Sequence, residues 1–375
     1  MVELDGSYGE GGGALVRVAL ALSALTGEPL SVKNIRANRP EPGLKAQHLE
    51  AIKALKQICE AKTSDIALGS TEFWFHPGKI KKGTYEINIG TAGSITLALQ
   101  ALILPCLFAS GKVTLKIKGG TCGKWQASVD YLQHLLLPHL QRFVEKIEMK
   151  ILQRGYYPAG GGEIHLEISP RFKLKMSLKE LQEEMKNKVS KIRLLERGEL
   201  QLIKGIINSS KELEEKEVGE RIKHVAEGSI KKYNVPINIE IEYAKSQSIG
   251  GEFLLWANFS SQEFDNRIIL GSSVLIEKGK SSEQIGKEAA ELLIKEIESD
   301  GAVDKHLADQ LVPFMALLPE SEIFVSEITE HTKTNIYVIE KFLPVKFEIE
   351  GRKIKVLEDK QINSRSTNPL HPKIF

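Results

Sequence analysis

The chain has 375 residues, of which 42% are hydrophobic and 27% are charged, which is ordinary for a globular enzyme with a sizeable core. The formal net charge of +2 argues against binding of nucleic acid through bulk positive charge, although a local basic pocket is still allowed. A chain of this length can form one large domain or two ordinary ones.

The first half of the chain predicts a plan of strand, glycine-rich turn and helix that recurs several times. Alternating patterns predict strands at 2–6, 30–37, 85–90, 111–121 and, as a pair around a glycine-rich turn, within 148–169. Apolar residues at three- and four-residue spacing predict helices at 14–27, 43–59, 94–104 and 129–143. Gly27 is expected to end the first helix as its C′ residue. This recurrence indicates an α/β fold built from repeated units.

The composition changes near residue 175, where strongly charged segments begin. We interpret 184–276 as a smaller inserted α/β domain, so that 1–183 and 277–375 together form the larger domain. A helix is expected at 281–300. The tail from residue 360 is polar and rich in proline and asparagine, and we expect it to be weakly ordered.

Membrane insertion and disulfide chemistry are not expected. The most apolar stretch, residues 95–109, is interrupted by Gln100 and Pro105 and is too short to span a bilayer. No signal peptide is apparent at the N-terminus. Three widely spaced cysteines predict neither a disulfide framework nor a zinc site, which favours the reducing cytoplasm.

Two glycine- or arginine-containing segments could bind anions. The segment "LDGSYGEGGGALVR" leads a glycine run into a helix, whose backbone N–H groups could approach a phosphate near Glu10 and Arg17. It lacks the Walker A and dinucleotide-binding patterns, so a tight structural turn is the alternative. Arg36 and Arg39 lie in a loop stiffened by two prolines, which suits bidentate phosphate binding, although such arginines are often simply solvated.

Three further positions could carry chemistry. Gln100 lies in an apolar helix and needs a partner, which a nearby backbone group could also provide. Asp309 in "DKHLADQLVPF" could hold a metal ion bound to a polyphosphate, or this segment could be an ordinary helix start capped by Asp304. His331, in "EITEHTKTNIYVIEKFL", is expected at the mouth of a strand as a capping residue, a packing residue or a nucleophile.

Taken together, these segments resemble the RNA 3′-terminal phosphate cyclase family almost from end to end. The resemblance is carried, in chain order, by "LDGSYGEGGG", "IRANRPEPGLKAQHL", "IGTAGSITLALQ", "GGT…VDY", "RGYYPAGGGE", "HLADQLVPFMAL" and "EHTKTNIYVIEKFLPV". It implies a large domain of three repeated βαβαββ units with a smaller α/β insert. It also implies conversion of an RNA 3′-terminal phosphate into a 2′,3′-cyclic phosphodiester with ATP and a divalent cation, Mg²⁺ or Mn²⁺. By analogy with relatives, it suggests a homodimer.

The resemblance also assigns roles to residues. It implies that His331 attacks the α-phosphate of ATP and carries AMP covalently. Residues expected to contact ATP are Gln100, His306, Leu307, Ala308, Asp309 and Gln310, with Asp309 also near the metal. Residues expected to bind phosphates of ATP or RNA are Glu10, Arg17, Arg36, Arg39 and Gln47, with His48 supporting that wall.

The chain departs from the family pattern at two places. Ala14-Leu15 replace a common Gln-Ile pair, and Ala127-Ser128 replace a common Pro-Pro pair that would affect how adenine is held. Three rival functions are a non-catalytic relative that assembles ribosomes, a nucleotidyltransferase with a lysine nucleophile, and an enolpyruvyl transferase. The first is disfavoured because His331 and Asp309 are present, and the second because no K-x-D-G signature occurs. The third needs no covalent AMP, so a test for an ATP-derived adduct would separate it from a cyclase.

Overall fold

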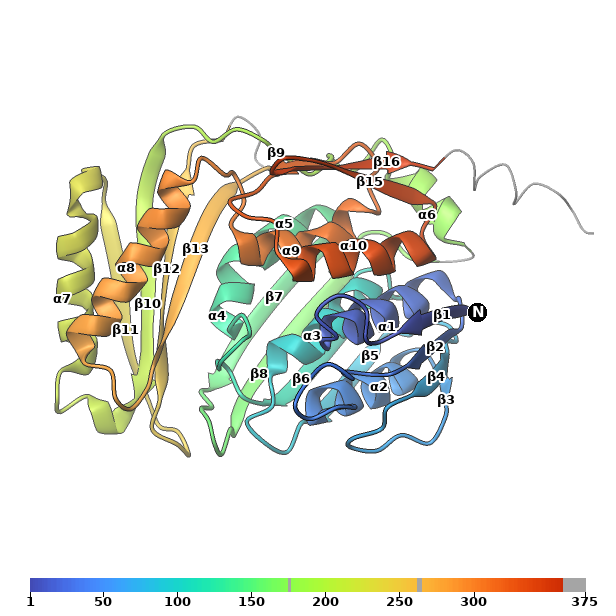
Figure 1. Ribbon diagram of the computed structural model, residues 1–375, viewed down its shortest axis with the longest axis horizontal. Helices are drawn as coiled ribbons and strands as arrows, with labels where there is room; N and C mark the ends of the chain where they lie inside the picture. The colour runs from blue at the N-terminus through green and yellow to red at the C-terminus, as the bar shows by residue number, and fades with distance from the viewer. Residues whose placement is uncertain (175–176, 262–264, 360–375) are drawn as a thin grey trace, which may run out of the picture.

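The computed structural model describes residues 1–174, 177–261 and 265–359 (Figure 1). The tail from residue 360 that we expected to be weakly ordered lies outside these residues. The described strands form four sheets of four strands each, and every sheet combines one parallel pair with two antiparallel pairs.

The first unit occupies the N-terminal end of the chain. Its elements are β1 (Val2–Asp5), α1 (Ala14–Thr26), β2 (Leu30–Lys33), α2 (Ala46–Ile58), β3 (Lys62–Thr63) and β4 (Phe73–His76). The sheet order is β1-β2-β4-β3, and α1 connects the parallel strands β1 and β2. Gly27 ends α1 with a φ of 77°, as the sequence predicted.

The second unit repeats this plan with longer strands. Its elements are β5 (Gly83–Asn88), α3 (Ile95–Cys106), β6 (Val113–Gly119), a helical segment that includes α4 (Val129–Tyr131) and α5 (Leu137–Leu140), β7 (Val144–Gln153) and β8 (Gly162–Pro170). The sheet order is β5-β6-β8-β7, with β5 and β6 parallel.

The third unit is interrupted after its first strand. It follows α6 (Leu178–Met185) and consists of β9 (Arg193–Leu194), α9 (Lys305–Met315), β14 (Glu322–Phe324), α10 (Glu330–Phe342), β15 (Val345–Glu350) and β16 (Lys353–Glu358). β9 pairs in parallel with β14, more than a hundred residues later. The expected three βαβαββ units are therefore confirmed.

The insert is a separate sheet with its own hydrophobic core. It consists of β10 (Leu200–Ser210), α7 (Val218–Ile230), β11 (Ile237–Ala244), β12 (Gly251–Phe259), β13 (Ile268–Ile276) and α8 (Ser282–Glu298). In Figure 1, α7 and α8 lie side by side against this sheet.

The packing of the insert differs from the predicted boundaries of 184–276 at both ends. At the start, β9 belongs to the third unit because it pairs with β14. At the end, α8 contributes Ile285, Leu293 and Ile297 to the insert core, although we had placed it in the larger domain. We therefore propose residues 200–298 as the insert.

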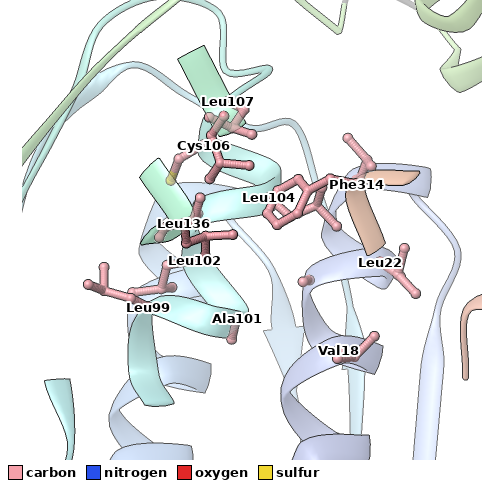
Figure 2. Close-up of a cluster of buried hydrophobic side chains, with 14 of the residues drawn as sticks. Val18, Leu22, Leu99, Ala101, Leu102, Leu104, Cys106, Leu107, Leu136 and Phe314 are labelled. Carbon is pink, nitrogen blue, oxygen red and sulfur yellow. The ribbon is translucent and has the colours of Figure 1, made fainter. Parts of the chain in front are cut away.

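The main core places the N-terminus of α1 at the centre of the larger domain. Every residue of α1 from Ala14 to Leu25 is buried, and the helix packs against both α3 and α10. Figure 2 shows part of the main core around α1 and α3, with Val18 and Leu22 of α1, Ala101 and Leu104 of α3 and Phe314 of α9. The predicted buried helix at 95–109 is therefore confirmed as α3, and α1 carries its glycine run to the side of α10.

Candidate active site

The glycine run before α1 passes so close to other side chains that larger residues would not fit. Gly13 is the N-cap of α1, and a Cβ there would lie 2.2 Å from His48 Nε2. A Cβ on Gly12 would lie 3.2 Å from Arg39 Nη2, and Gly11 has a left-handed φ of 57°. The run thus brings the N-terminus of a buried helix directly against a histidine and an arginine.

His331 lies on a helix, so the expectation of a strand mouth was wrong. It is the second residue of α10, and Thr329 is the N-cap because its side chain accepts a hydrogen bond from Thr332 N. The His331 side chain is 42% exposed, and its Nε2 lies 3.3 Å from Glu10 Oε2. His331 therefore neither caps the helix nor packs in the core, and its ring faces the glycine run.

The surroundings of His331 favour a neutral imidazole. Burial lowers its pKa, the charge of Glu10 raises it, and Arg17 and Arg39 lower it, with a net result below the usual 6.5. A neutral ring keeps a lone pair available at neutral pH, which a nucleophile needs.

Arg17 links three of the predicted site residues. It is buried on α1 and donates from Nε to Gln100 Oε1 at 2.7 Å, while its Nη1 lies 3.4 Å from His48 Nε2. Gln100 is thus paired with a side chain and not with the backbone. Burial lowers the Arg17 pKa to about 10, so the guanidinium stays charged at neutral pH.

His48 supports this wall as a neutral side chain. It is buried, and its Nδ1 accepts a hydrogen bond from Lys45 N at 3.1 Å. Burial lowers its pKa well below 6.5, and the charges of Arg17, Arg36 and Lys45 lower it further.

Arg36 and Arg39 carry hydrogen-bond donors that nothing in the described chain satisfies. Arg39 Nη2 pairs with Glu10 Oε2 at 2.9 Å, yet the Nε atoms of both arginines are buried without a partner among the described residues. Arg36 also has a positive φ of 57°, which is uncommon for a residue with a side chain. Unpartnered guanidinium donors next to a helix N-terminus fit an anion with several oxygens.

The segment 304–310 is both an ordinary helix start and a wall of the site. Asp304 caps α9, because its Oδ1 accepts hydrogen bonds from His306 N and Leu307 N. Leu307 and Ala308 are fully buried in the main core, so their side chains do not face the site. Gln310 Nε2 donates to the backbone oxygen of His306 within the helix.

Asp309 is the acidic side chain whose charge interacts with that of Arg17. Burial raises its pKa to about 8; Arg17 acts to lower it, and the charges of Asp304 and Glu10 raise it. A bound cation would relieve the unfavourable effect of these neighbouring carboxylates on ionised Asp309. Asp309 and Glu10 therefore suit a divalent ion, although the described residues contain no group of three histidine, cysteine, aspartate or glutamate side chains that could hold a metal by themselves.

The remaining predicted residues lie at the edges of the candidate active site. His306 keeps surface exposed at the rim of the site. Partial desolvation of its ring lowers its pKa, Asp304 raises it, and Lys305 and His331 lower it, with a net result below 6.5. Gln47 lies near the turn after β5, since its Oε1 would be 3.6 Å from a Cβ on Gly93. At the two departures from the family pattern, Ala14 opens α1, and the Ala127 oxygen accepts a hydrogen bond from Thr96 Oγ1 at 2.6 Å.

Sequence reasoning missed two residues that hold α10 in place. Asn335 Nδ2 donates to the backbone oxygen of Asp309 at 2.7 Å, which fixes α10 against α9. Thr334 lies against the glycine run, because a Cβ on Gly9 would be 2.6 Å from its Oγ1. The signal was present: Asn335 is a polar residue one turn after His331, at the start of an apolar run.

A helix able to cross a membrane is absent from the part of the chain that the structure describes. Cys59, Cys106 and Cys122 are all buried, and each is a free thiol.

The fold defines an α/β protein of three repeated units, in which arginines with unpartnered donors and a half-exposed histidine lie beside the N-terminus of a buried helix. A model of the family described as RNA 3′-terminal phosphate cyclase matches residues 8–349. Curated proteins named RNA 3′-terminal phosphate cyclase from Methanopyrus kandleri and Pyrococcus abyssi are 40% and 41% identical to this chain. These similarities cover 94% and 95% of this chain and 96% and 99% of the two relatives. The relative of the same name from Archaeoglobus fulgidus is 40% identical over 94% of this chain and 99% of its own length.

The chain therefore belongs to the RNA 3′-terminal phosphate cyclase family, as its motifs predicted. This membership makes it an enzyme of the ligase type and implies the use of ATP. It also disfavours the rival assignments to lysine nucleotidyltransferases and enolpyruvyl transferases.

Proposed function

We propose that this protein converts the 3′-terminal phosphate of RNA into a 2′,3′-cyclic phosphodiester at the expense of ATP. The observation that carries the proposal is the position of His331, whose half-exposed ring faces Glu10 beside arginines with unpartnered Nε donors. A candidate nucleophile and guanidinium donors that suit a polyphosphate thereby lie in one cluster.

The reaction needs three displacements at phosphorus. His331 attacks the α-phosphorus of ATP, a phosphorus–nitrogen bond forms, and the bond to the β-phosphate breaks as pyrophosphate leaves. The RNA 3′-phosphate then attacks the same phosphorus, which releases the histidine and gives an anhydride between RNA and AMP. Finally, the neighbouring 2′-hydroxyl attacks the 3′-phosphorus, loses its proton and expels AMP. The covalent stage divides one difficult displacement into easier ones, because a phosphate monoester lacks a good leaving group.

The side chains around His331 suit these steps. Burial lowers the pKa of the imidazole against the opposing charge of Glu10, and Arg17 and Arg39 lower it further, so the ring is neutral before attack. Arg36 and Arg39 can stabilise the negative charge that develops on phosphate oxygens, as guanidinium clamps do. A divalent cation held by Asp309 and Glu10 would neutralise charge on the polyphosphate. Asn335 holds the backbone of Asp309 and so positions this carboxylate.

A covalent-labelling experiment tests the proposal without any RNA. The protein is incubated with α-³²P-labelled ATP and Mg²⁺ or Mn²⁺, denatured, and examined for retained label. Wild type should give an acid-labile adduct, and His331→Ala should give none. His224→Ala is the matched control, because this exposed histidine lies on α7 of the insert, and it should label like wild type.

The outcome also separates the proposal from the alternative of a non-catalytic protein of ribosome assembly. Wild-type protein that binds ATP but forms no adduct would favour the alternative. An adduct that persists in His331→Ala would refute the role of His331 but not the nucleotidyl transfer.

A further inference from the structure

Three large apolar side chains lie exposed on loops near the junction of the larger domain and the insert. Trp125 is 96% exposed, Tyr157 is 79% exposed and Ile249 is 65% exposed. We call these three residues the aromatic ledge. Exposed apolar groups that are gathered in one place often mark a binding surface, because leaving them in water is unfavourable.

The loop that carries Trp125 is ordered by its own contacts. Val129 N donates to the oxygen of Thr121 at 2.9 Å and closes the loop, while Lys124 pairs with Glu277 at 2.8 Å. Trp125 has a left-handed φ of 61°, which is a strained conformation for a bulky side chain. The loop therefore holds this indole outward at a cost in backbone energy, a pattern that clusters at ligand-binding sites.

Hydrogen bonds tie the three loops of the ledge together. Thr121 and Gly155, which precede Trp125 and Tyr157 by four and two residues, exchange backbone and side-chain hydrogen bonds of 2.9–3.1 Å. On the other side, Ala159 N donates to Ser248 Oγ at 3.0 Å. Ser248 is the neighbour of Ile249, so the ledge continues from the larger domain onto the insert.

The ledge is also continuous with the candidate active site. Thr96 Oγ1 donates to the oxygen of Ala127 at 2.6 Å, two residues after Trp125. Gln100 follows Thr96 by four residues on α3, which is a rise of about 6 Å along the helix. Gln100 in turn pairs with Arg17 in the wall of the site. These hydrogen bonds therefore connect the loop that carries Trp125 to the wall of the site through α3.

We propose that the aromatic ledge is a stacking subsite for single-stranded RNA, with Trp125 receiving a base near the 3′ end. This inference rests on the proposed function, since the strand whose terminal phosphate meets His331 must leave the site over some part of the surface. Flat aromatic faces bind bases of any sequence by stacking. The exposed Lys245 in the insert loop can approach the phosphates of such a strand.

The fluorescence of Trp125 tests the proposal directly. The other tryptophans are Trp74, which is 39% exposed, and Trp256, which is 5% exposed, so Trp125 is the most accessible of the three. Titration with a short unstructured RNA bearing a 3′-phosphate should quench wild-type emission. The quench should disappear in Trp125→Phe and persist in Trp74→Phe, the matched control.

Affinity for the same RNA gives the second measurement. Trp125→Ala should raise the Kd by about 5- to 150-fold, the effect typical of losing one stacked base. Trp125→Phe should recover most of this loss, because a phenyl ring still stacks. Tyr157→Ala should weaken binding less if it receives the following base.

Self-labelling with ATP, measured on every variant, separates the two proposals. Absence of labelling in wild type would refute the proposed function. Intact labelling together with unchanged RNA affinity in Trp125→Ala would refute only the proposal that the aromatic ledge binds RNA. Quenching that is identical in wild type and Trp125→Phe would also overturn it. A change in oligomeric mass of Trp125→Ala, with RNA affinity unchanged, would instead identify the ledge as a protein contact.

Discussion

Two clusters of charged side chains in this molecule look similar in composition but differ in how their partners are arranged. In the candidate active site, Arg36 and Arg39 keep buried Nε donors without partners, and His331 is open to solvent. At the junction with the insert, Asp130 and Arg154 are almost completely buried and directly paired.

The junction cluster consists of Asp130, Arg154, Asn208, Glu242 and Glu252. Arg154 Nη2 donates to Asp130 Oδ1 at 3.0 Å and to Glu242 Oε2 at 2.6 Å. Asn208 Nδ2 donates to Asp130 Oδ2 at 3.2 Å. Glu242 and Asn208 belong to the insert, whereas Asp130 and Arg154 belong to the larger domain, so the cluster joins the two.

The comparison shows that a shifted pKa alone does not identify a functional site. Burial raises the pKa of Asp309 in the site and of Glu252 in the junction cluster. What separates the two regions is the open face of the site and the donors of Arg36 and Arg39 that no protein group satisfies. The junction cluster also has an unpartnered atom, Glu252 Oε2, but Glu252 is completely buried, whereas the unpartnered guanidinium donors lie in the same cluster as the half-exposed His331.

Removal of Arg154 from the junction cluster should reduce the stability of the folded protein strongly, whereas removal of an arginine from the site should not. Arg154→Ala leaves the buried carboxylate of Asp130 without its cation, which should cost about 3–5 kcal/mol of unfolding free energy. Urea unfolding followed by circular dichroism would measure the loss.

Arg39→Ala is the matched arginine variant from the site. Its pair with Glu10 is more than one third exposed on the Arg39 side, so its loss should cost less than about 1 kcal/mol of stability. The rate of self-labelling should nevertheless fall about 100-fold or more, because a donor to developing phosphate charge is lost. Equal destabilisation by the two variants would contradict the distinction between a structural and a functional cluster.

Glu252 gives a second, pH-dependent test of the junction cluster. Burial and the nearby Asp130 raise its pKa from 4.5 to about 7, against hydrogen bonds that lower it. The folded protein therefore holds this proton more tightly than the unfolded chain. Stability should fall between pH 4.5 and 7, and the loss at pH 8 should approach roughly 3 kcal/mol.

Glu252→Gln should remove this loss, so the variant should gain stability over wild type as the pH rises from 5 to 8. Thermal or urea unfolding of both proteins across this range gives the difference. Glu296, whose pKa burial also raises to about 7, contributes equally to both curves and cancels. A constant difference across the range would show that Glu252 is already ionised in the folded protein at pH 5.

The sequence predicted the repeated units well because their signals are local. Alternation in the strands, the apolar face of α2 and the αL glycine at 27 all act within one element. The prediction of a strand after His331 was wrong because the run "NIYVI" is rich in residues with a high preference for β-strands. The Thr329 cap and the packing of α10 against α1 and α9 stabilise a helix there instead.

Contacts between segments far apart in the chain could not be predicted from the sequence. The pairing of β9 with β14 spans the whole insert, and no local pattern shows that a two-residue strand belongs to a sheet completed much later. The same holds for the contact between Asn335 and the backbone of Asp309. Leu307 and Ala308 were included with their neighbours by resemblance, but the helical turn directs their side chains into the core.

The pH dependence of the self-labelling rate should change only slightly between variants, but this change reports specifically on the protonation of His331. Only neutral His331 can attack, so the rate should rise with pH through an apparent pKa below 6.5 and then level off. Arg39→Gln should move this pKa upward for two reasons. It removes a positive charge that lowers the pKa of His331, and it frees the charge of Glu10, which raises it.

Glu10→Gln should move the same apparent pKa downward, because the charge that favours the imidazolium is removed. Initial labelling rates at saturating ATP from pH 4.5 to 9 would give both profiles. Opposite shifts are diagnostic, since a general loosening of the site would expose His331 to water and move both profiles upward toward 6.5. If both variants shift upward, loosening of the site outweighs the charges of Arg39 and Glu10, and these charges do not set the protonation of His331.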